Sequence, residues 1–332
     1  MSQKHSVNFA NFVCRFGEEL VLLDLAEEVV IPAFLNGGQR KYGESKYIIQ
    51  NTAIINYGDK QTDLVIVGRF IRDTILSSEQ KLENGQIVKS KASIPSAPSA
   101  IFALVLDTHK LLYLPETAHA PALSAYRATA ANIIKIQHKV FINNLYEAGK
   151  GMKDRKTRKK LLEEYPYPKI EVVPMASSQD FKHFLNQFKV LEQIKIEIID
   201  TNNEIDGLDL VKSARSLKDN IKATGATISY KNGKGLSKSH SLDKFTTLAQ
   251  DGNTKMTLSG KDSEGAKLAG DNEKFKMSVA IEPDTDDPKK IGKQLFDVFT
   301  HKVKSGLVKI QKPAADVTQK IGQLAAKFLP NG

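Results

Sequence analysis

The chain has a single cysteine, Cys14, and no tryptophan. One cysteine excludes a disulfide within the chain and any zinc module built from several cysteines. The longest apolar run, residues 101–106, has the length of a strand, whereas a membrane-spanning helix needs about 20 apolar residues. With no apolar segment of signal-peptide type behind residues 1–3, the sequence predicts a cytoplasmic protein.

Catalytic and cofactor motifs are also scarce. The sequence contains no GxSxG nucleophile motif, no phosphate-binding GxxxxGK[ST] motif and no GxGxxG motif after a strand. Its 7 histidines never stand at the spacing of two or four residues that a metal pair needs. We therefore expect no catalytic cluster, no metal site and no cofactor.

Positive charge is what the sequence has in excess. The 48 Lys and Arg residues exceed the 38 Asp and Glu residues by 10, which calls for an anionic partner. Residues 1–148 hold 15 basic and 14 acidic side chains, whereas residues 149–332 hold 33 and 24. Nearly all of the excess therefore belongs to the second half.

Three basic stretches carry most of this excess, at residues 150–160, 211–240 and 289–312. A single charged stretch is usually a solvated face, but three in one half favour a binding surface. The candidate DNA contacts are the basic residues of the first two stretches: Lys150, Lys153, Arg155, Lys156, Arg158, Lys159, Lys160, Lys212, Arg215, Lys218, Lys222, Lys231, Lys234 and Lys238.

Helical geometry sharpens one of these stretches. At about 100° per residue, the four cations of residues 206–224 fall within an arc of about 120°, beside an apolar arc of Leu210, Ala214, Leu217 and Ile221. We expect this helix to end at Gly225, to dock by the apolar arc and to present its cations to the phosphates of a duplex. Few aromatic and arginine residues lie nearby, which favours duplex binding with low sequence specificity.

Two alternatives stay open. Glu197 lies in a predicted strand and Asp200 lies just after it. Such carboxylates could hold the divalent ion of a nuclease. Residues 289–310 form an amphipathic helix with basic flanks, which suits core or dimer packing, a membrane surface, or docking of an adaptor on a membrane effector.

The pattern of the first half predicts a mixture of strands and helices. Strands are expected at residues 7–16, 48–57, 64–70, 101–106 and 111–114, the last two joined as a tight hairpin, and helices at 17–30 and 121–146. Residues 34–43 and the Pro- and Ser-containing residues 90–99 are predicted to be loops.

The second half continues the mixture. Strands are expected at residues 169–173, 194–198, 226–230, 255–258 and 274–281, and further helices at 177–188, 289–310 and 315–328. Because no regular βαβ repeat appears, we predict an α+β protein of two mixed sheet and helix domains with C-terminal helices. The expected division is a strand-rich domain at 1–148, a basic linker at 149–168 and a basic DNA-binding domain at 169–332.

This order of elements resembles that of the RexA-like phage-exclusion proteins. The resemblance covers residues 64–299 and rests on the strand at 64–70, the segment 98–113, the strand at 169–174 before residues 181–188, and the helix-Gly-Ala ending of 216–226. It implies a cytoplasmic homodimer that binds double-stranded DNA and acts as a sensor in phage exclusion. The layout is also similar to that of RdgC, which encircles DNA, and of the antiphage protein KwaB.

Overall fold

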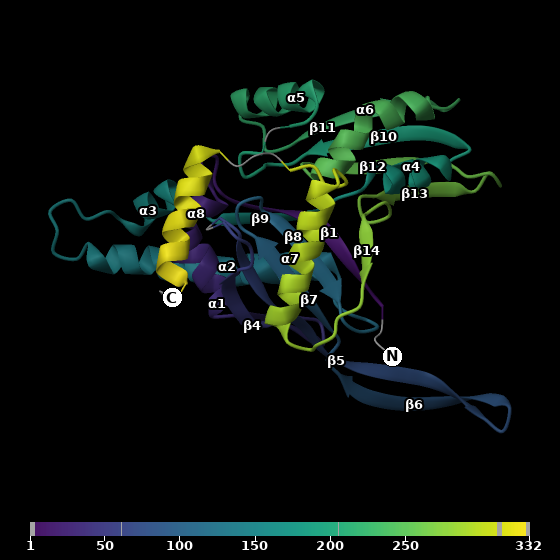
Figure 1. The fold of residues 1–332 in the computed structure, drawn as a ribbon, viewed down its shortest axis with the longest axis horizontal. Helices are drawn as coiled ribbons and strands as arrows, with labels where there is room; N and C mark the ends of the chain where they lie inside the picture. The colour runs from purple at the N-terminus through teal and green to yellow at the C-terminus, as the bar shows by residue number, and fades with distance from the viewer. Residues whose placement is uncertain (1–3, 61, 205, 311–313, 330–332) are drawn as a thin grey trace.

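The computed structural model describes residues 4–60, 62–204, 206–310 and 314–329. Within these residues the chain forms two antiparallel sheets with helices packed on them (Figure 1), which confirms the predicted α+β class. The larger sheet has the strand order β14-β1-β8-β7-β5-β4-β3, and the smaller has the order β11-β10-β12-β13.

The larger sheet is built mostly from the first half of the chain. Its main path consists of β1 (His5–Phe16), β3 (Gly38–Tyr42), β4 (Ser45–Asn56), β5 (Leu64–Glu83), β7 (Ser99–Val105), β8 (Lys110–Pro115) and β14 (Ser278–Ile281). Beside this path, β2 (Leu20–Val21) and β9 (Pro168–Pro174) pair with β1, and β6 (Gln86–Ser96) pairs with β5.

Helices cover both faces of this sheet. The face with Phe102 and Tyr113 packs against α1 (Ile31–Leu35), α2 (Leu123–Ala148) and α8 (Ala315–Phe328). The opposite face, with Ile101 and Leu112, packs against α7 (Pro288–Lys304). Because neighbouring residues of a strand point to opposite faces, a sheet buried on both sides needs continuous apolar strands, and β7 and β8 are of this kind.

The smaller sheet belongs to the second half. It comprises β10 (Val190–Ile198), β11 (Ala226–Lys231), β12 (Thr254–Lys261) and β13 (Lys267–Asp271), with α4 (Ser178–Asn186), α5 (Asp209–Asn220) and α6 (Lys238–Asp251) beside them. Buried Ile194, Ile196 and Ile198 alternate with exposed neighbours, as their spacing predicted. The predicted cap of α4 is confirmed, because Ser177 accepts from the Asp180 amide.

Sheet membership does not follow the division of the chain expected at residues 149–168. Both β9 and β14 pair with β1, and α7 and α8 pack on the larger sheet. Long-range backbone pairing thus assigns four elements of the second half to the first sheet. The separate part of the second half runs only from about α4 to β13.

Four local predictions were wrong. Residues 38–42 form β3, and most of residues 90–99 lie in β6, where Pro95 is tolerated because β6 pairs on one side only. Residues 238–251, for which no helix was predicted, form α6 behind an N-cap at Ser237. Residues 17–30 contain β2 and short 3-10 and π turns in place of one helix, before α1 begins at Ile31.

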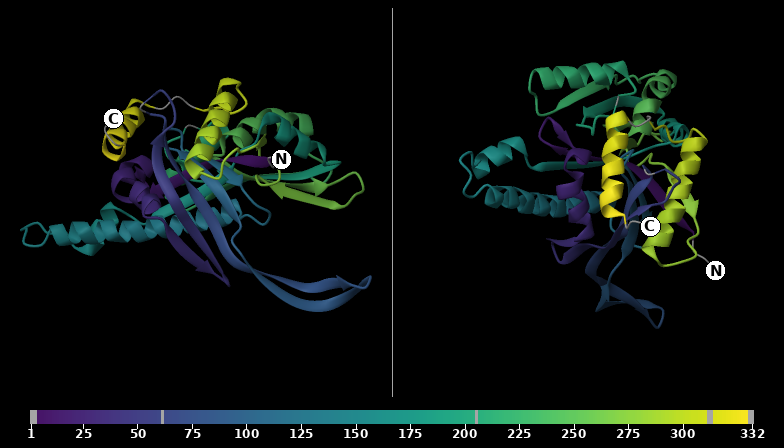
Figure 2. Two further views of the ribbon diagram at one scale, coloured as in Figure 1. Left: turned by 60° about the horizontal axis from the view of Figure 1, so that its bottom comes forward. Right: turned by 60° about the vertical axis from the view of Figure 1, so that its left-hand side comes forward.

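The C-terminal part of β5 and the whole of β6 extend from the body as a two-stranded ribbon, which we call the arm (residues 74–96). Figure 2 shows it projecting away from the rest of the chain. Positive φ angles at Asn84 (50°) and Gly85 (75°) form the tight turn at its tip.

Candidate nucleic-acid interface and a buried polar pocket

The first basic stretch lies at the tip formed by α2 and α3 (Arg158–Glu164), which Figure 1 shows at the left of the molecule. All residues from 150 to 160 are exposed. Lys150 pairs with Glu147, and the Lys156 Nζ lies 2.7 Å from a carboxylate oxygen of Glu164. The other acidic contact of this stretch is a 4.0 Å approach of Arg158 to Glu147.

Four cations of this stretch form no ion pair in the described part of the chain: Lys153, Arg155, Lys159 and Lys160. The hydrogen bond from Lys150 lowers the pKa of Glu147, and the charges of Lys150, Arg155 and Arg158 lower it further. The guanidinium carbons of Arg155 and Arg158 lie 3.9 and 4.1 Å from the centroid of the Tyr146 ring. These cation–π contacts order the arginines without neutralising them. The tip therefore offers positive charge that is free to meet an anion.

The predicted orientation of α5 was wrong. Val211 and Lys218 are buried, whereas Leu217 and Ile221, predicted to pack, are 60% and 65% exposed. The helix also ends at Asn220, before the predicted Gly225, with Lys222 in the left-handed conformation (φ 54°). Most of the predicted apolar arc therefore faces solvent, and only Ala214 of its four residues packs against the core of the smaller sheet.

Ion pairs explain this orientation. Arg215 donates two hydrogen bonds of 2.7 Å to the carboxylate of Asp206, and Lys218 Nζ donates to Asp200 and Asp219 at 2.9 and 2.8 Å. Charge-assisted hydrogen bonds of this kind turn the two cations toward the body. Two members of the predicted phosphate-binding stripe are therefore neutralised within the chain.

The remaining cations of this stretch are mostly free. Four of them are exposed and form no ion pair within the described residues: Lys212 on α5, Lys222 just after it, Lys231 at the end of β11 and Lys234 in the following turn. Lys238 lies in the first turn of α6 and donates to the backbone oxygen of Phe188 at 2.8 Å. Four of the seven predicted contacts thus remain available.

The fold adds two cations that the sequence analysis missed. Arg15 of β1 and Lys169 of β9 line a cavity of about 320 Å³ together with Arg215, Lys218 and Lys222. The lining also contains Glu18, Asp200 and Asp219, and Lys169 is paired with Asp200 at 2.9 Å. Because β9 pairs with β1, residues more than 150 positions apart meet here. No local sequence pattern signals this pairing.

The carboxylates proposed for a nuclease have other partners. Burial would raise the pKa of Asp200, but hydrogen bonds from Lys218 and Lys169 outweigh it and lower that pKa to about 2. Glu197 lies 3.9 Å from Lys255 Nζ and its side chain is half exposed. Among the described residues, no group of three or more His, Cys, Asp or Glu is arranged to hold a metal ion.

The third basic stretch flanks a helix that is already packed. Ile291, Leu295 and Phe299 of α7 are buried against the larger sheet, so its apolar side is not available to a lipid surface. Lys289 and Lys304 are exposed at its two ends, and Lys312 lies outside the described residues.

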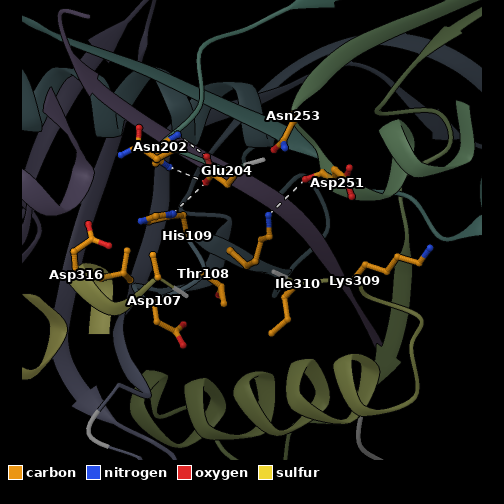
Figure 3. Close-up of a pocket in the computed structure, with 14 residues that line it drawn as sticks. Asp107, Thr108, His109, Asn202, Glu204, Asp251, Asn253, Lys309, Ile310 and Asp316 are labelled. Carbon is orange, nitrogen blue, oxygen red and sulfur yellow. Dashed lines mark hydrogen bonds and ion pairs between the residues drawn. The ribbon is translucent and has the colours of Figure 1, made fainter. Parts of the chain in front are cut away.

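A polar pocket with both buried and exposed lining residues lies between the two sheets (Figure 3). His109 ends the turn before β8, Lys110 is the first residue of β8, and Asn202 and Glu204 come from the loop after β10. His109 Nδ1 lies 3.1 Å from Glu204 Oε1, and Asn202 Nδ2 donates to the backbone oxygen of Phe12 at 2.8 Å. These contacts fasten the smaller sheet to the larger one.

Lys110 extends the same network. Its Nζ donates to Asn11 Oδ1 at 3.0 Å, and Asn11 Nδ2 donates to Asn253 Oδ1 at 3.1 Å. Burial lowers the pKa of Lys110, while the carboxylates of Glu204 and Asp251 oppose that shift. Lys110 therefore helps to hold the two sheets together and is not exposed to a macromolecular partner.

The carboxyl groups around this pocket differ in their titration. Burial raises the pKa of Asp107 and of Asp251 to about 6. Burial acts on Glu204 in the same direction, but the hydrogen bond from His109 and the charges of His109 and Lys110 lower its pKa to about 2. Ionised Glu204 therefore holds the proton of His109 on Nδ1.

The sequence analysis did not bring this pocket together, because His109 and Glu204 are 95 residues apart. His109 Nε2 is buried without a hydrogen-bond partner in the described part of the chain. Carboxyl groups outnumber lysines in the lining, which contains Asp107, Glu204, Asp251 and Asp316 against Lys110 and Lys309. The excess of carboxyl groups in the lining disfavours binding of a phosphate, so the pocket is distinct from the cationic surfaces.

Comparison of the sequence with models of protein families and with curated proteins finds no match. No helix within the described ranges has both the length and the apolar composition needed to cross a membrane.

Proposed function

We propose that this protein binds double-stranded DNA with little sequence preference, mainly through the α2–α3 tip. The observation that carries the proposal is the exposure of Lys153, Arg155, Lys159 and Lys160 without an acidic partner among the described residues. Lysine and arginine side chains that neutralise phosphates release counterions from DNA, and this release supplies sequence-independent affinity.

A second contact surface is supported by the free cations of the smaller sheet. Lys212 of α5, Lys222 just after it, Lys231 at the end of β11 and Lys234 in the following turn are exposed, and α5 packs beside β11. Eight unpaired cations in two groups suit the backbone of a duplex better than a compact anion.

Duplex DNA is favoured over a single strand by the contacts of Tyr146, an aromatic side chain at the tip. Arg155 and Arg158 both lie over the Tyr146 ring, which leaves that ring unavailable to stack on a base. Single-strand binding proteins combine their cations with open aromatic platforms.

Action as a sensor in phage exclusion is the part of the proposal that rests on the resemblance to RexA-like proteins. Its test is the plating efficiency of infecting phages on cells that express the protein. Phages should plate with the same efficiency on cells that express a DNA-binding-deficient variant as on cells without the protein.

The binding experiment is a salt titration of affinity for a duplex of arbitrary sequence. Replacing Lys153, Arg155, Lys159 and Lys160 by Glu should weaken binding at least tenfold and reduce the steepness of its salt dependence, since each lost phosphate contact removes about one unit of slope. A matched control reverses four other exposed lysines without acidic partners in the described residues: Lys41, Lys46, Lys267 and Lys274.

The control separates a defined surface from overall charge, because both variants change the net charge equally. Equal losses in the two variants would remove the tip as the binding surface. A wild-type protein that binds no duplex at low salt would overturn the proposed function.

A further inference from the structure

The polar pocket between the two sheets contains a buried hydrogen-bonding atom that the chain leaves without a partner. His109 is only 4% exposed, and its Nδ1 lies 3.1 Å from Glu204 Oε1. Its Nε2 is buried and makes no hydrogen bond to any described residue. Because buried polar atoms are nearly always hydrogen-bonded, this nitrogen indicates that a group from outside the chain completes the pocket.

The tautomer of His109 defines what that group must offer. Ionised Glu204 holds the ring proton on Nδ1, so Nε2 of the neutral ring is a hydrogen-bond acceptor. In Figure 3 the Nε2 edge of the ring is turned away from Glu204 and toward the side of the pocket on which Asp316 lies. A ligand at this position therefore has to donate a hydrogen bond.

The charge of the lining favours a cationic donor. Burial raises the pKa of Asp251 to about 6, although the charges of Lys110 and Lys309 oppose this shift. The cations of the chain therefore do not fully compensate this carboxyl group. Asp316 is exposed and forms no ion pair within the described ranges. A cation bound between them would favour the ionised form of both carboxyl groups.

The two lysines of the lining leave room for such a cation. Lys110 Nζ donates to Asn11 Oδ1 at 3.0 Å and lies 3.5 Å from the backbone oxygen of Asp251. Figure 3 shows the side chain of Lys309 extending away from the centre of the pocket. The side of the pocket between His109 Nε2 and Asp316 is therefore not occupied by an ammonium group of these lysines.

The size and layout of the pocket limit the ligand. Its volume is about 170 Å³, and a cavity of about 150 Å³ holds benzene, which has six heavy atoms. Asp316 and Asp251 lie on opposite sides of the pocket, with Thr108 and Ile310 between them (Figure 3). Because Asp316 and Asn203 in the lining are exposed, the pocket can be reached from solvent.

We propose that this pocket binds a small linear diamine. One ammonium group donates a hydrogen bond to His109 Nε2 and faces Asp316, the other faces Asp251, and the methylene chain lies along Ile310. A diamine with a chain of four carbon atoms has six heavy atoms, which this volume accommodates. The site is separate from the cations of the α2–α3 tip, so the proposal does not depend on the proposed DNA binding.

Calorimetric titration with diaminobutane near neutral pH, in the absence of DNA, tests this binding. The diamine should bind and should raise the temperature of thermal unfolding, because a ligand that binds only the folded chain stabilises it. Butanediol of the same chain length, which has no charge, should do neither, and butylamine, which has one ammonium group, should bind more weakly. No binding of the diamine, or equal binding of the diol or the monoamine, would overturn the proposal.

His109→Asn separates the role of Nε2 from that of Nδ1. The asparagine amide nitrogen can still donate to Glu204, but the residue has no atom in the place of Nε2. Asparagine also tolerates the left-handed backbone of this position, where φ is 56°. The variant should keep the circular dichroism spectrum of the wild-type protein and bind diaminobutane about tenfold more weakly. Wild-type affinity in this variant would overturn the assignment of Nε2.

Asp316→Asn tests the charge of the pocket without altering the contact between the sheets. It should weaken diamine binding about threefold, since it removes one exposed carboxylate. The matched control, Asp209→Asn, removes an exposed carboxylate from the first turn of α5, as Asp316→Asn does from the first turn of α8. Equal losses in the two variants would indicate an effect of net charge and would overturn the site. Because these titrations contain no DNA, diamine binding and DNA binding can each fail alone.

Discussion

Arg215 and Asp206 form a two-pronged ion pair, with two N–H···O distances of 2.7 Å and only 4% of the Asp206 side chain exposed. The pair joins α5 to the loop before it and turns Arg215 away from solvent. Helical geometry alone assigns Arg215 to a DNA-binding stripe. In the structure, Arg215 instead stabilises the position of its own helix.

The first prediction separates these two roles. Arg215→Ala should lower the free energy of unfolding by about 3 kcal/mol, because it leaves the Asp206 carboxylate buried without its partner. Lys212→Ala, on the exposed side of the same helix, should leave stability within about 0.5 kcal/mol and weaken DNA binding slightly. Urea unfolding measures the first effect and a duplex titration the second. Equal stability of the two variants would contradict the assignment.

The second prediction concerns acid stability. The folded-state pKa of Asp200 is about 2, below its ordinary value of 3.8, so its stabilising contribution is present above pH 4 and is lost as the pH falls toward 2. Asp200→Asn should therefore be less stable at neutral pH and should lose less stability between pH 4 and pH 2.

Urea unfolding at several pH values measures this difference in slope. Glu79→Gln removes an exposed carboxylate of the arm that has no ion pair in the described residues, and it should behave like the wild-type protein. A wild-type slope in Asp200→Asn would show that the pairing with Lys169 and Lys218 does not stabilise the fold.

The third prediction tests the contact between His109 and Glu204, which joins the two sheets. His109→Ala should destabilise the protein by roughly 1–3 kcal/mol, because it removes a hydrogen bond from a mostly buried carboxylate. Glu204→Gln should cost less, since an amide oxygen can still accept from His109 Nδ1.

A double-mutant cycle on His109 and Glu204 isolates the interaction. The two losses should not add, because each variant breaks the same contact. Strict additivity in thermal or urea unfolding would mean that the pair is not energetically coupled.

The fourth prediction concerns packing around Gly68 in β5. A Cβ atom there would lie 2.6 Å from Thr52 Cγ2 and 2.8 Å from Phe102 Cζ, and Phe102 is fully buried. Gly68→Ala should therefore cost about 1–3 kcal/mol. Gly322→Ala on α8 places the new methyl group more than 4 Å from the described atoms outside its own helix turn, so it should raise the free energy of unfolding by up to about 1 kcal/mol. Thermal unfolding of both variants measures these changes.

Local patterns predicted the elements whose signal is local. The alternation of Ile194, Ile196 and Ile198 predicted β10, the apolar runs at 101–106 and 111–114 predicted the β7–β8 hairpin, and the 121–146 periodicity predicted α2. Each of these depends on which side chains share a face, and spacing decides that directly.

Composition misled where the environment overrides it. The serines and prolines of residues 90–99 are typical of a loop, yet most of them lie in β6, because a ribbon exposed on both sides needs no apolar core. The bulge between Ser78 and Gln80 of the arm likewise becomes visible only when the register of both strands is known.

The sequence by itself determined the α+β class, the location of the excess positive charge and the helical arcs on which charged and apolar residues lie. Tertiary structure decided which arc docks and which cations remain free. Arg215 and Lys218 have Asp206 and Asp200 within reach, whereas Lys212 and Lys222 have no ion pair among the described residues. Asp200 and Asp206 lie in the segment between β10 and α5, and the fold of that segment brings them to the helix. A residue as remote as Lys169 reaches the same Asp200, and no pattern within one segment encodes these distances.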